Sequence, residues 1–308
     1  RLRYAIMLSE AGFEMDDGVV GRLAPDRFHV TTTTGGAARV LAHMEDYLQT
    51  EFTDLQVWLT STTEQWAVIA LQGPRAREIL APLVEGIDLS ASAMPHMSVR
   101  QGRVAGVPAR LATGFTDGEC FTGELGFEIN APADHGPAVW QALRERGRDF
   151  ALTLYGTETM HVLRAEKGYI IVGQETDGTV TPGDLGLDWA VGKAKKDFVG
   201  KRSLTRPDMI KPDRKQLVGL LTLDPKITLE EGAQIVARAD APIGTPALGH
   251  VTSSYFSDAL GHSIALALVS GGRARMGEVL HVPMPNGPIA VRVADPVFYD
   301  REGKRLDG

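Results

Sequence analysis

The sequence predicts an α+β protein whose last region is an all-β domain, and three observations support this. The first stretch of the 308-residue chain combines β-rich runs with a helical pattern, and a middle region mixes the two patterns again. Beyond residue 215, short apolar runs separated by glycines and prolines follow one another without a helical pattern, which is typical of a β-barrel or sandwich. The Pro- and charge-rich run 205–215 marks the boundary before this last region.

The N-terminal region is predicted to contain three strands and then a helix. The apolar run 2–8 predicts the first strand, and the β-rich runs 12–23 and 27–34 predict the next two. Residues 35–50 open with two glycines and then place apolar side chains at helical spacing, which predicts an amphipathic helix. A further strand is expected at 54–61.

The middle region is predicted to begin with a strand, a Gly-Pro turn and a helix within 66–84, followed by a hairpin at 96–116. Two helices are expected at 134–150 and 156–168, with Thr157 as the N-cap of the second. The C-terminal region is expected to hold six strands, which lie at 216–223, 233–238, 249–256, 263–269, 278–284 and 289–295.

The composition argues against several function classes. A formal charge of −7 disfavours nucleic acid as the main partner, because phosphate binding needs clustered Lys and Arg. The short basic run 193–196 is expected to be a solvated segment. The chain has no apolar run of about 18 residues and no signal peptide, so neither a membrane span nor export is expected.

The single cysteine, Cys120, rules out a disulfide within the chain and fits a reducing cytoplasm, where we expect the protein. No histidine lies near Cys120 in the sequence, so a packing role is favoured over a nucleophilic one. The dinucleotide-binding glycine fingerprint, the nucleophile elbow and a metal-ligand spacing of histidines are all missing from the sequence. The chain starts at Arg1 within a strand-like run, which indicates a piece of a longer polypeptide.

Two acidic segments are candidates for a functional site. Asp16 and Asp17 precede Gly18, and the pattern alone favours a tight turn with two solvated acids. Glu124 and Glu128 lie in a glycine-rich segment, and Glu128 falls at the start of an expected strand. A carboxylate there suits a ligand with two adjacent N–H donors, because both oxygens can accept; an exposed strand end is an equal alternative.

A basic pair is the third candidate. Arg164 and Lys167 lie about one turn apart on the helix expected at 156–168. The pattern favours a surface position in which Arg164 pairs with Glu158 or Glu166, and a functional role is the alternative.

Motifs along the whole chain carry a family resemblance. They are "MLSEAGFEMDDGVV", "ALQGPRA", "FTGELGFEI", "LRAEKGYIIVGQETDGTVTPGDLGLDWAV", "DFVGKRSL" and "GHVTSSYFSDALGHSIALALV". In this order they resemble the folate-dependent aminomethyltransferases, a family that includes the T-protein of the glycine cleavage system and the folate domains of sarcosine and dimethylglycine oxidases. Within it, "MDDGVV" and "RAEKGYIIVGQETDGTVTP" most resemble the C-terminal part of the alpha subunit of heterotetrameric sarcosine oxidases.

The resemblance implies a three-domain cloverleaf around a central folate site. Residues 1–64 would form a ferredoxin-like α+β domain, 65–212 a central α+β folate-binding domain, and 213–308 a C-terminal β-barrel. The family has a further segment before "MLSEAG" that this sequence lacks, so the first domain is expected to be incomplete.

The resemblance also implies roles for single residues. Asp17 aligns with the essential aspartate and Glu128 with the pterin-binding glutamate, while Arg164 and Tyr4 fall at positions of the folate site. Phe121 replaces a tyrosine of the T-proteins, so a hydroxyl is lost there. Two neighbours are considered with Asp17: Asp16 would cap the turn or raise the pKa of Asp17 by like-charge proximity, and Gly18 would let the folate chain pass close by.

The implied reaction is one-carbon transfer. Tetrahydrofolate would trap the imine from sarcosine oxidation as 5,10-methylenetetrahydrofolate, with Asp17 as general base and stabilising charge and Glu128 gripping the pterin. Other sarcosine oxidase subunits are the expected partners, and FAD, FMN and NAD are expected only there, so this chain alone would show no oxidase activity. The alternatives are a glycine-cleavage T-protein served by a lipoyl carrier protein, and a non-catalytic folate-binding module.

Overall fold

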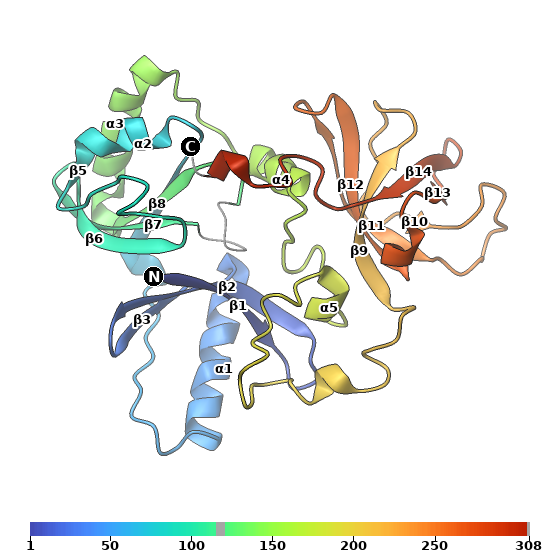
Figure 1. Cartoon of the computed structure of the whole chain (residues 1–308), viewed down its shortest axis with the longest axis horizontal. Coiled ribbons are helices and arrows are strands. Elements are labelled where there is room, and N and C mark those ends of the chain that lie inside the picture. Colours follow the sequence, from blue (N-terminus) through green and yellow to red (C-terminus); the bar gives the residue numbers. More distant parts are fainter. Residues whose placement is uncertain (115–120, 307–308) are drawn as a thin grey trace. The chain divides into compact units, whose positions relative to one another are not determined.

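The computed structural model describes residues 1–114 and 121–306 of the chain (Figure 1). The chain forms two compact units. The first unit contains residues 1–5, 16–154 and 303 onwards, and the second contains residues 6–15 and 155–302. The three-domain division at 64/65 and 212/213 stays a prediction, and Cys120 lies outside the described residues.

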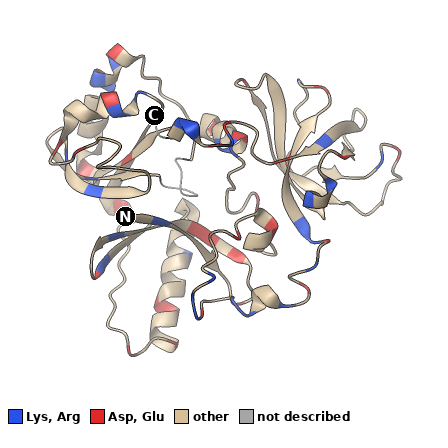
Figure 2. Ribbon diagram, in the orientation of Figure 1, with Lys and Arg blue, Asp and Glu red and all other residues tan. Residues whose placement is uncertain are grey.

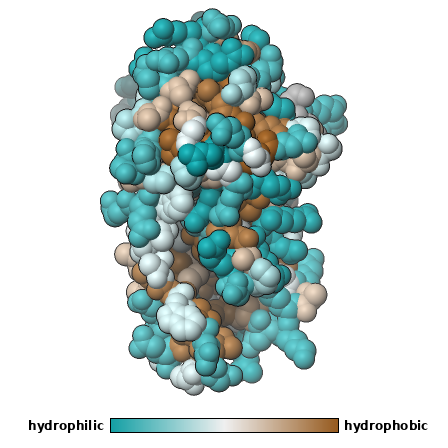
Figure 3. All heavy atoms as spheres, turned by 90° about the vertical axis from the view of Figure 1, so that its left-hand side faces the viewer, coloured by the Kyte–Doolittle hydropathy of each residue, from teal (hydrophilic) through white to brown (hydrophobic). Residues whose placement is uncertain are grey.

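The N-terminal order of three strands and one helix is confirmed. Strands β1 (Leu2–Leu8), β2 (Glu14–Ala24) and β3 (Arg27–Val30) form a sheet in the order β1-β2-β3, and helix α1 (Ala37–Thr50) follows. The expected strand at 54–61 is wrong, because that segment has no strand partner for its backbone and its side chains are mostly exposed. Trp58, in this segment, is 86% exposed. Figure 3 shows apolar side chains among hydrophilic ones in the lower part of its view.

The first unit also contains a five-stranded antiparallel sheet, in the order β4-β8-β7-β6-β5. Its strands are β4 (Trp66–Gln72), β5 (Val84–Glu85), β6 (Ser98–Val104), β7 (Val107–Thr113) and β8 (Gly126–Pro132). Helices α2 (Ala76–Leu80) and α3 (Gly136–Gly147) cover one face of this sheet (Figure 1). The core between them includes Leu71, Leu111, Phe127 and Ile129 from the strands and Ile79, Leu80, Val139 and Leu143 from the helices.

The second unit contains α4 (Thr157–Glu166), α5 (Pro182–Leu185) and the C-terminal strands. These strands are β9 (Lys215–Thr222), β10 (Gln234–Ile235), β11 (Gly249–Ser257), β12 (His262–Ser270), β13 (Val279–Val282) and β14 (Ile289–Ala294). They are ordered β10-β11-β12-β9-β14-β13, and a bridge between Val236 and His281 brings the two ends together. The predicted β-barrel is therefore confirmed.

The apolar run of β12 reflects burial on both of its faces. Ala265, Ala267 and Val269 point into the barrel core. The larger Ile264, Leu266 and Leu268 pack outside it, against residues of α4, α5 and their connecting loops. Helix α4 begins at Thr157, but Gly156 holds the cap position in extended backbone without a side-chain hydrogen bond, so the expected Thr157 N-cap is wrong. Short 3₁₀ helices lie at Thr34–Gly36, Thr63–Gln65, Ala81–Leu83, Ala133–His135, Arg148–Phe150, Ser203–Thr205, Gly272–Arg275 and Lys304–Leu306.

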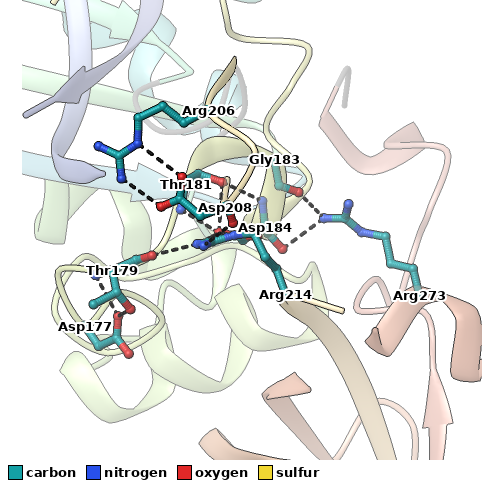
Figure 4. Close-up of polar contacts among 9 residues, drawn as sticks. All are labelled: Asp177, Thr179, Thr181, Gly183, Asp184, Arg206, Asp208, Arg214 and Arg273. Carbon is teal, nitrogen blue, oxygen red and sulfur yellow. Dashed lines mark hydrogen bonds and ion pairs between the residues drawn. The ribbon is translucent and has the colours of Figure 1, made fainter. Parts of the chain in front are cut away.

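A polar cluster around Asp184 ties α5 to the barrel (Figure 4). Thr181 and Asp184 form a reciprocal capping box at the start of α5. The guanidinium of Arg214, at the residue before β9, pairs with the Asp184 carboxylate at 2.5 Å. Arg273 donates to the carbonyl oxygens of Gly183 and Asp184 at the end of the same short helix.

Replacing Asp184 with alanine is expected to lower the free energy of unfolding by about 3 kcal/mol, because it removes the cap and leaves the Arg214 charge without its partner. Urea unfolding followed by circular dichroism measures the loss. Asp208→Ala is the matched control in the same cluster. Its ion pair with Arg206 is exposed, so the loss should stay below about 1 kcal/mol. Equal losses in the two variants would contradict the assignment.

Candidate active site

Asp16 and Asp17 lie within β2, near its start, so the interpretation of this segment as a tight turn is wrong. Figure 2 shows the acidic colour within this strand. The neighbouring Gly18 explains why the strand continues: a Cβ at this position would overlap the backbone carbonyl of Thr31. Gly18 therefore permits the close approach of the chain after β3, which is one reason for a glycine here. Its expected role toward the folate chain stays a prediction.

Asp17 is a buried carboxyl held by a tyrosine. The Tyr4 hydroxyl, on β1, donates a hydrogen bond of 2.8 Å to Oδ2 of Asp17. Burial raises the pKa of Asp17 to about 6, the Tyr4 hydrogen bond opposes the rise, and the nearby charge of Asp16 adds to it. The expected like-charge effect of Asp16 thus acts in the predicted direction, as a smaller cause than burial. A carboxyl with this pKa can accept and return a proton near neutral pH.

Glu128 lies on the face of the five-stranded sheet opposite to α2 and α3. It is directly across from Ala70 on β4 and from Ala112 on β7. Its neighbours Phe127 and Ile129 point into the apolar core, as the strand alternation predicted. The carboxyl of Glu128 therefore stands on the face of the sheet that the helices leave uncovered.

This face of the sheet meets the three-stranded sheet within the first unit. Ala112 packs against Leu2 of β1 and Val19 of β2. Further along the same faces, Arg110 of β7 contacts Nδ1 of His29 on β3 at 3.4 Å. The two sheets therefore face each other across a layer of side chains.

The side chains of Tyr4, Asp17 and Glu128 project into the layer between these two sheets. Side chains two residues apart on a strand share a face, so Tyr4 lies on the face of Leu2 and Asp17 on the face of Val19. Glu128 shares its face with Ala112, which contacts both Leu2 and Val19. The fold thus brings Tyr4, Asp17 and Glu128 to facing surfaces, although the two acids are 111 positions apart in the sequence.

Glu128 is half-buried and, among the residues that the structure describes, no hydrogen bond or ion pair reaches its carboxyl. Burial raises the pKa of Glu128 to about 8. Its register neighbours Ala70 and Ala112 are small and apolar, so neither can satisfy it. A carboxyl in this state is available to a ligand that brings N–H donors, which would stabilise its charged form.

Arg164 belongs to the second unit and is completely buried. Its guanidinium pairs with Glu175 at 2.8 Å and donates to the hydroxyl of Ser253 at 2.5 Å and to the carbonyl of Tyr169 at 3.0 Å. The surface interpretation, with Glu158 or Glu166 as partner, is therefore wrong. A role of Arg164 toward folate stays a prediction, and its described contacts hold α4 to β11 and the loop after α4.

Glu124 is separate from the facing sheet surfaces. Its carboxylate pairs with Arg305 near the end of the chain. It also lines a cavity of about 220 Å³ together with Met94 and Leu125, which belong to the core on the helix-covered side of the sheet. Glu128 is not among the residues that line this cavity.

Sequence reasoning missed three residues around the acidic pair. Thr33 and Arg39 contact Asp16, and Gly36 leaves space for its carboxylate. The threonine run and paired glycines before α1 are the only local hint of this arrangement. No group of three or more His, Cys, Asp or Glu side chains within residues 1–114 and 121–306 is arranged to hold a metal ion.

Comparison with known families accounts for nearly the whole chain. Residues 1–195 match the GCVT N-terminal domain, and residues 215–300 match the glycine cleavage T-protein C-terminal barrel domain. The chain belongs to the GCVT family. An aminomethyltransferase of Thermotoga petrophila is 33% identical over 93% of this chain and 72% of its own length. The crystal structure of aminomethyltransferase T from Bartonella henselae has the same fold, with a TM-score of 0.80 at 24% identity, covering 98% of this chain and 76% of that one.

Higher identity is found with subunits of another enzyme. The sarcosine oxidase alpha subunit of Corynebacterium sp. (strain P-1) is 50% identical over 99% of this GCVT-family chain, and that of Rhizobium meliloti is 40% identical over the same share. In both cases the match covers 31% of the relative. The chain therefore spans about a third of the length of these alpha subunits.

The raised pKa of Asp17 predicts a pH-dependent gain of stability in Asp17→Asn. In the parent, the Asp17 carboxyl is protonated in both the folded and the unfolded chain below pH 3.8, and it is charged in both above about pH 6. The cost of burying its charge therefore develops between these two pH values. A shift of about two units corresponds to about 3 kcal/mol, which asparagine avoids. Denaturant unfolding at pH 4 and pH 7 should show the advantage of the variant growing with pH. A constant difference would contradict the buried-charge assignment.

Proposed function

We propose that this chain binds tetrahydrofolate and transfers a one-carbon unit to it, as the folate-binding part of a sarcosine oxidase. The imine formed from sarcosine would be trapped as 5,10-methylenetetrahydrofolate. The observation that carries the proposal is the placement of two features on facing sheet surfaces of one compact unit: the Tyr4–Asp17 pair, and the Glu128 carboxyl, which has no partner among the residues that the structure describes. The identity with sarcosine oxidase alpha subunits supports the choice of one-carbon donor.

Glu128 would bind the pterin ring of the folate. A pterin ring presents adjacent N–H donors, and a carboxylate accepts both in a bidentate arrangement. The half-buried carboxyl of Glu128, with no described partner, matches this requirement, because donors from a ligand would offset the cost of burying its charge. Binding is then expected to release the proton that Glu128 holds at neutral pH.

Asp17 supplies the base. Bound tetrahydrofolate offers its N5 and N10 nitrogens as nucleophiles toward the one-carbon unit. A bond forms between N5 and the imine carbon, and the bond from that carbon to the glycine nitrogen breaks, so that glycine leaves with a proton. N10 then closes the ring with the loss of a proton, which Asp17 accepts through a carboxyl whose pKa burial has raised to about 6. The same negative charge stabilises positive charge that develops on the substrate in a partly dehydrated site.

Tyr4 holds the base in place. Its hydroxyl donates to one oxygen of Asp17, which leaves the other oxygen to face a substrate. The hydrogen bond also limits the rise in the pKa of Asp17, so the carboxyl remains charged over more of the neutral range. Much of the rate enhancement would come from holding both reactants in one site and keeping water away from the imine.

The wider assembly is part of the same proposal. Other sarcosine oxidase subunits would deliver the imine, and FAD, FMN and NAD would bind in other parts of the complex. We place the complex in the cytoplasm. Within the described residues, no helix combines the length and apolar character needed to span a membrane.

Calorimetric titration of the chain with tetrahydrofolate is the first test. We expect binding, with an observed enthalpy that changes with the ionisation enthalpy of the buffer, because the buffer takes up the released proton. The second part adds sarcosine and the oxidising subunits and follows methylenetetrahydrofolate by chromatography. Formaldehyde as the sole one-carbon product in the presence of bound tetrahydrofolate would refute the transfer role.

The identity with aminomethyltransferases supports a second candidate, in which the one-carbon unit comes from a lipoyl carrier protein. Stimulation of methylenetetrahydrofolate formation by an aminomethyl-lipoyl carrier, but not by sarcosine and an oxidase, would favour this function. A chain that binds folate and supports neither reaction would instead be a non-catalytic folate-binding module.

A further inference from the structure

Asp16 is a second buried carboxylate that the proposed reaction does not use. It is fully buried, with none of its surface exposed. Oδ1 accepts hydrogen bonds from the backbone N–H of Asp17 at 2.9 Å and of Thr33 at 3.0 Å. Oδ2 accepts from the hydroxyl of Thr33 at 3.0 Å and pairs with Arg39 at 3.4 Å. Four donors to one carboxylate describe a position built to hold a charge.

Three of the four donors come from the segment that begins α1, namely the two groups of Thr33 and the guanidinium of Arg39. Thr33 immediately precedes the 3₁₀ turn Thr34–Gly36, and Gly36 is the N-cap of the 14-residue α1. A Cβ on Gly36 would overlap Oδ2 of Asp16, so the carboxylate lies against the backbone at this helix end. The positive end of the helix dipole adds to the stabilisation of a negative charge there.

We propose that Asp16 is a positioning residue for Asp17: it fixes β2 against the start of α1 and acts on one-carbon transfer only through Asp17. This inference rests on the proposed function of Asp17. The direct link is the hydrogen bond from the Asp17 backbone to Asp16, which fixes the strand at the residue that carries the base.

The charge of Asp16 provides a second link. Three influences on the Asp17 carboxyl come from its surroundings: burial between the sheets, the Tyr4 hydroxyl on β1, and the Asp16 carboxylate on its own strand. Burial and Asp16 raise the pKa of Asp17, and Tyr4 lowers it. Removing the negative charge at position 16 therefore lowers this pKa, whereas a purely structural residue would leave it unchanged.

Asp16→Asn in the full chain tests both links. Asparagine keeps the shape of the side chain and an acceptor oxygen for the two backbone N–H groups, but it removes the charge. We expect the carboxyl ¹³C titration of Asp17 to move to a lower midpoint than the parent value of about 6. We also expect the acid limb of the kcat–pH profile to move in the same direction, with KM for tetrahydrofolate unchanged.

A pair of glycine variants gives an independent test that keeps Asp16 itself. Gly36→Ala places a methyl group on Oδ2 of Asp16 and should displace the carboxylate. Gly35→Ala is the matched control, because a Cβ at Gly35 meets no described heavy atom within 4 Å. We expect Gly36→Ala to shift the Asp17 titration and to lower kcat about tenfold, and Gly35→Ala to match the parent.

Two outcomes would overturn the inference: a folded Asp16→Asn variant in which the Asp17 midpoint stays at the parent value, or glycine variants that behave alike. A rise in KM equal to the fall in kcat would also overturn it, because Asp16 would then act on binding. A parent chain that binds no tetrahydrofolate overturns the proposed function instead, and the carboxyl titration still reports whether Asp16 controls Asp17.

Discussion

Asp17→Asn is expected to lower the rate of methylenetetrahydrofolate formation about 10³-fold while the Kd for tetrahydrofolate changes by less than about threefold. Asparagine fits the same space and can still accept the hydrogen bond from Tyr4, so the site keeps its shape. It cannot take the proton, and it offers no negative charge to the developing cation. Single-turnover product formation and calorimetric binding, measured on the same preparation, separate the two effects.

Tyr4→Phe is the matched control for this prediction, since it removes the hydrogen bond and keeps the carboxylate. Because Tyr4 lowers the pKa of Asp17, its loss should move the acid limb of the rate profile to higher pH without abolishing turnover. If Asp17→Asn loses binding and turnover to the same extent, Asp17 is a binding residue and the role of base belongs elsewhere.

Glu128→Gln is expected to weaken tetrahydrofolate binding about 100-fold, and Glu128→Ala to remove measurable binding. Glutamine keeps one acceptor oxygen but turns the other into a donor, so the bidentate contact with the pterin is lost at a cost of about 2–3 kcal/mol. Titration calorimetry at constant pH measures the change. Glu124→Gln is the matched control, because that carboxylate pairs with Arg305 and lies away from the facing sheet surfaces.

The binding of the parent should also depend on pH with a defined sign. The pKa of Glu128 is raised to about 8 in the free chain, and the pterin requires the charged form. Affinity should therefore rise about tenfold per pH unit between pH 6 and pH 8 and then level off. This dependence should disappear in Glu128→Gln. A flat profile in the parent would contradict the assignment of Glu128 as the pterin acceptor.

The sequence predicted those parts of the fold that depend on local pattern. The alternation around Glu128 placed Phe127 and Ile129 on the opposite face, and both lie in the core. The apolar run of β12 predicted a strand because it is buried on both faces. The wrong strand prediction at 54–61 shows the limit of a local pattern. The composition of this segment is that of a strand, but its backbone hydrogen bonds would need a neighbouring strand, which a local pattern does not specify.

The candidate site shows a similar division. The resemblance of the motifs that contain Asp17 and Glu128 implied a base and a pterin acceptor, whereas the residue pattern around Asp17 alone favoured a turn with solvated acids. Their roles stay predictions, whereas their placement on facing sheets is a finding. Arg164 shows the opposite case, since its helical spacing favoured the surface and its actual partners, Glu175 and Ser253, lie 11 and 89 residues away.

By itself, the sequence determined the strand and helix periodicities, the all-β character of the C-terminal region and the family motifs, because each depends on residues that are close together in the chain. Only the tertiary structure decided that Asp16 and Asp17 lie within a strand, since that depends on the Thr31 backbone approaching Gly18. It also decided that Asp17 is buried against Tyr4 while Glu128 has no described partner. Burial and pairing set the charge of a carboxyl, and both arise from segments that are distant in the chain.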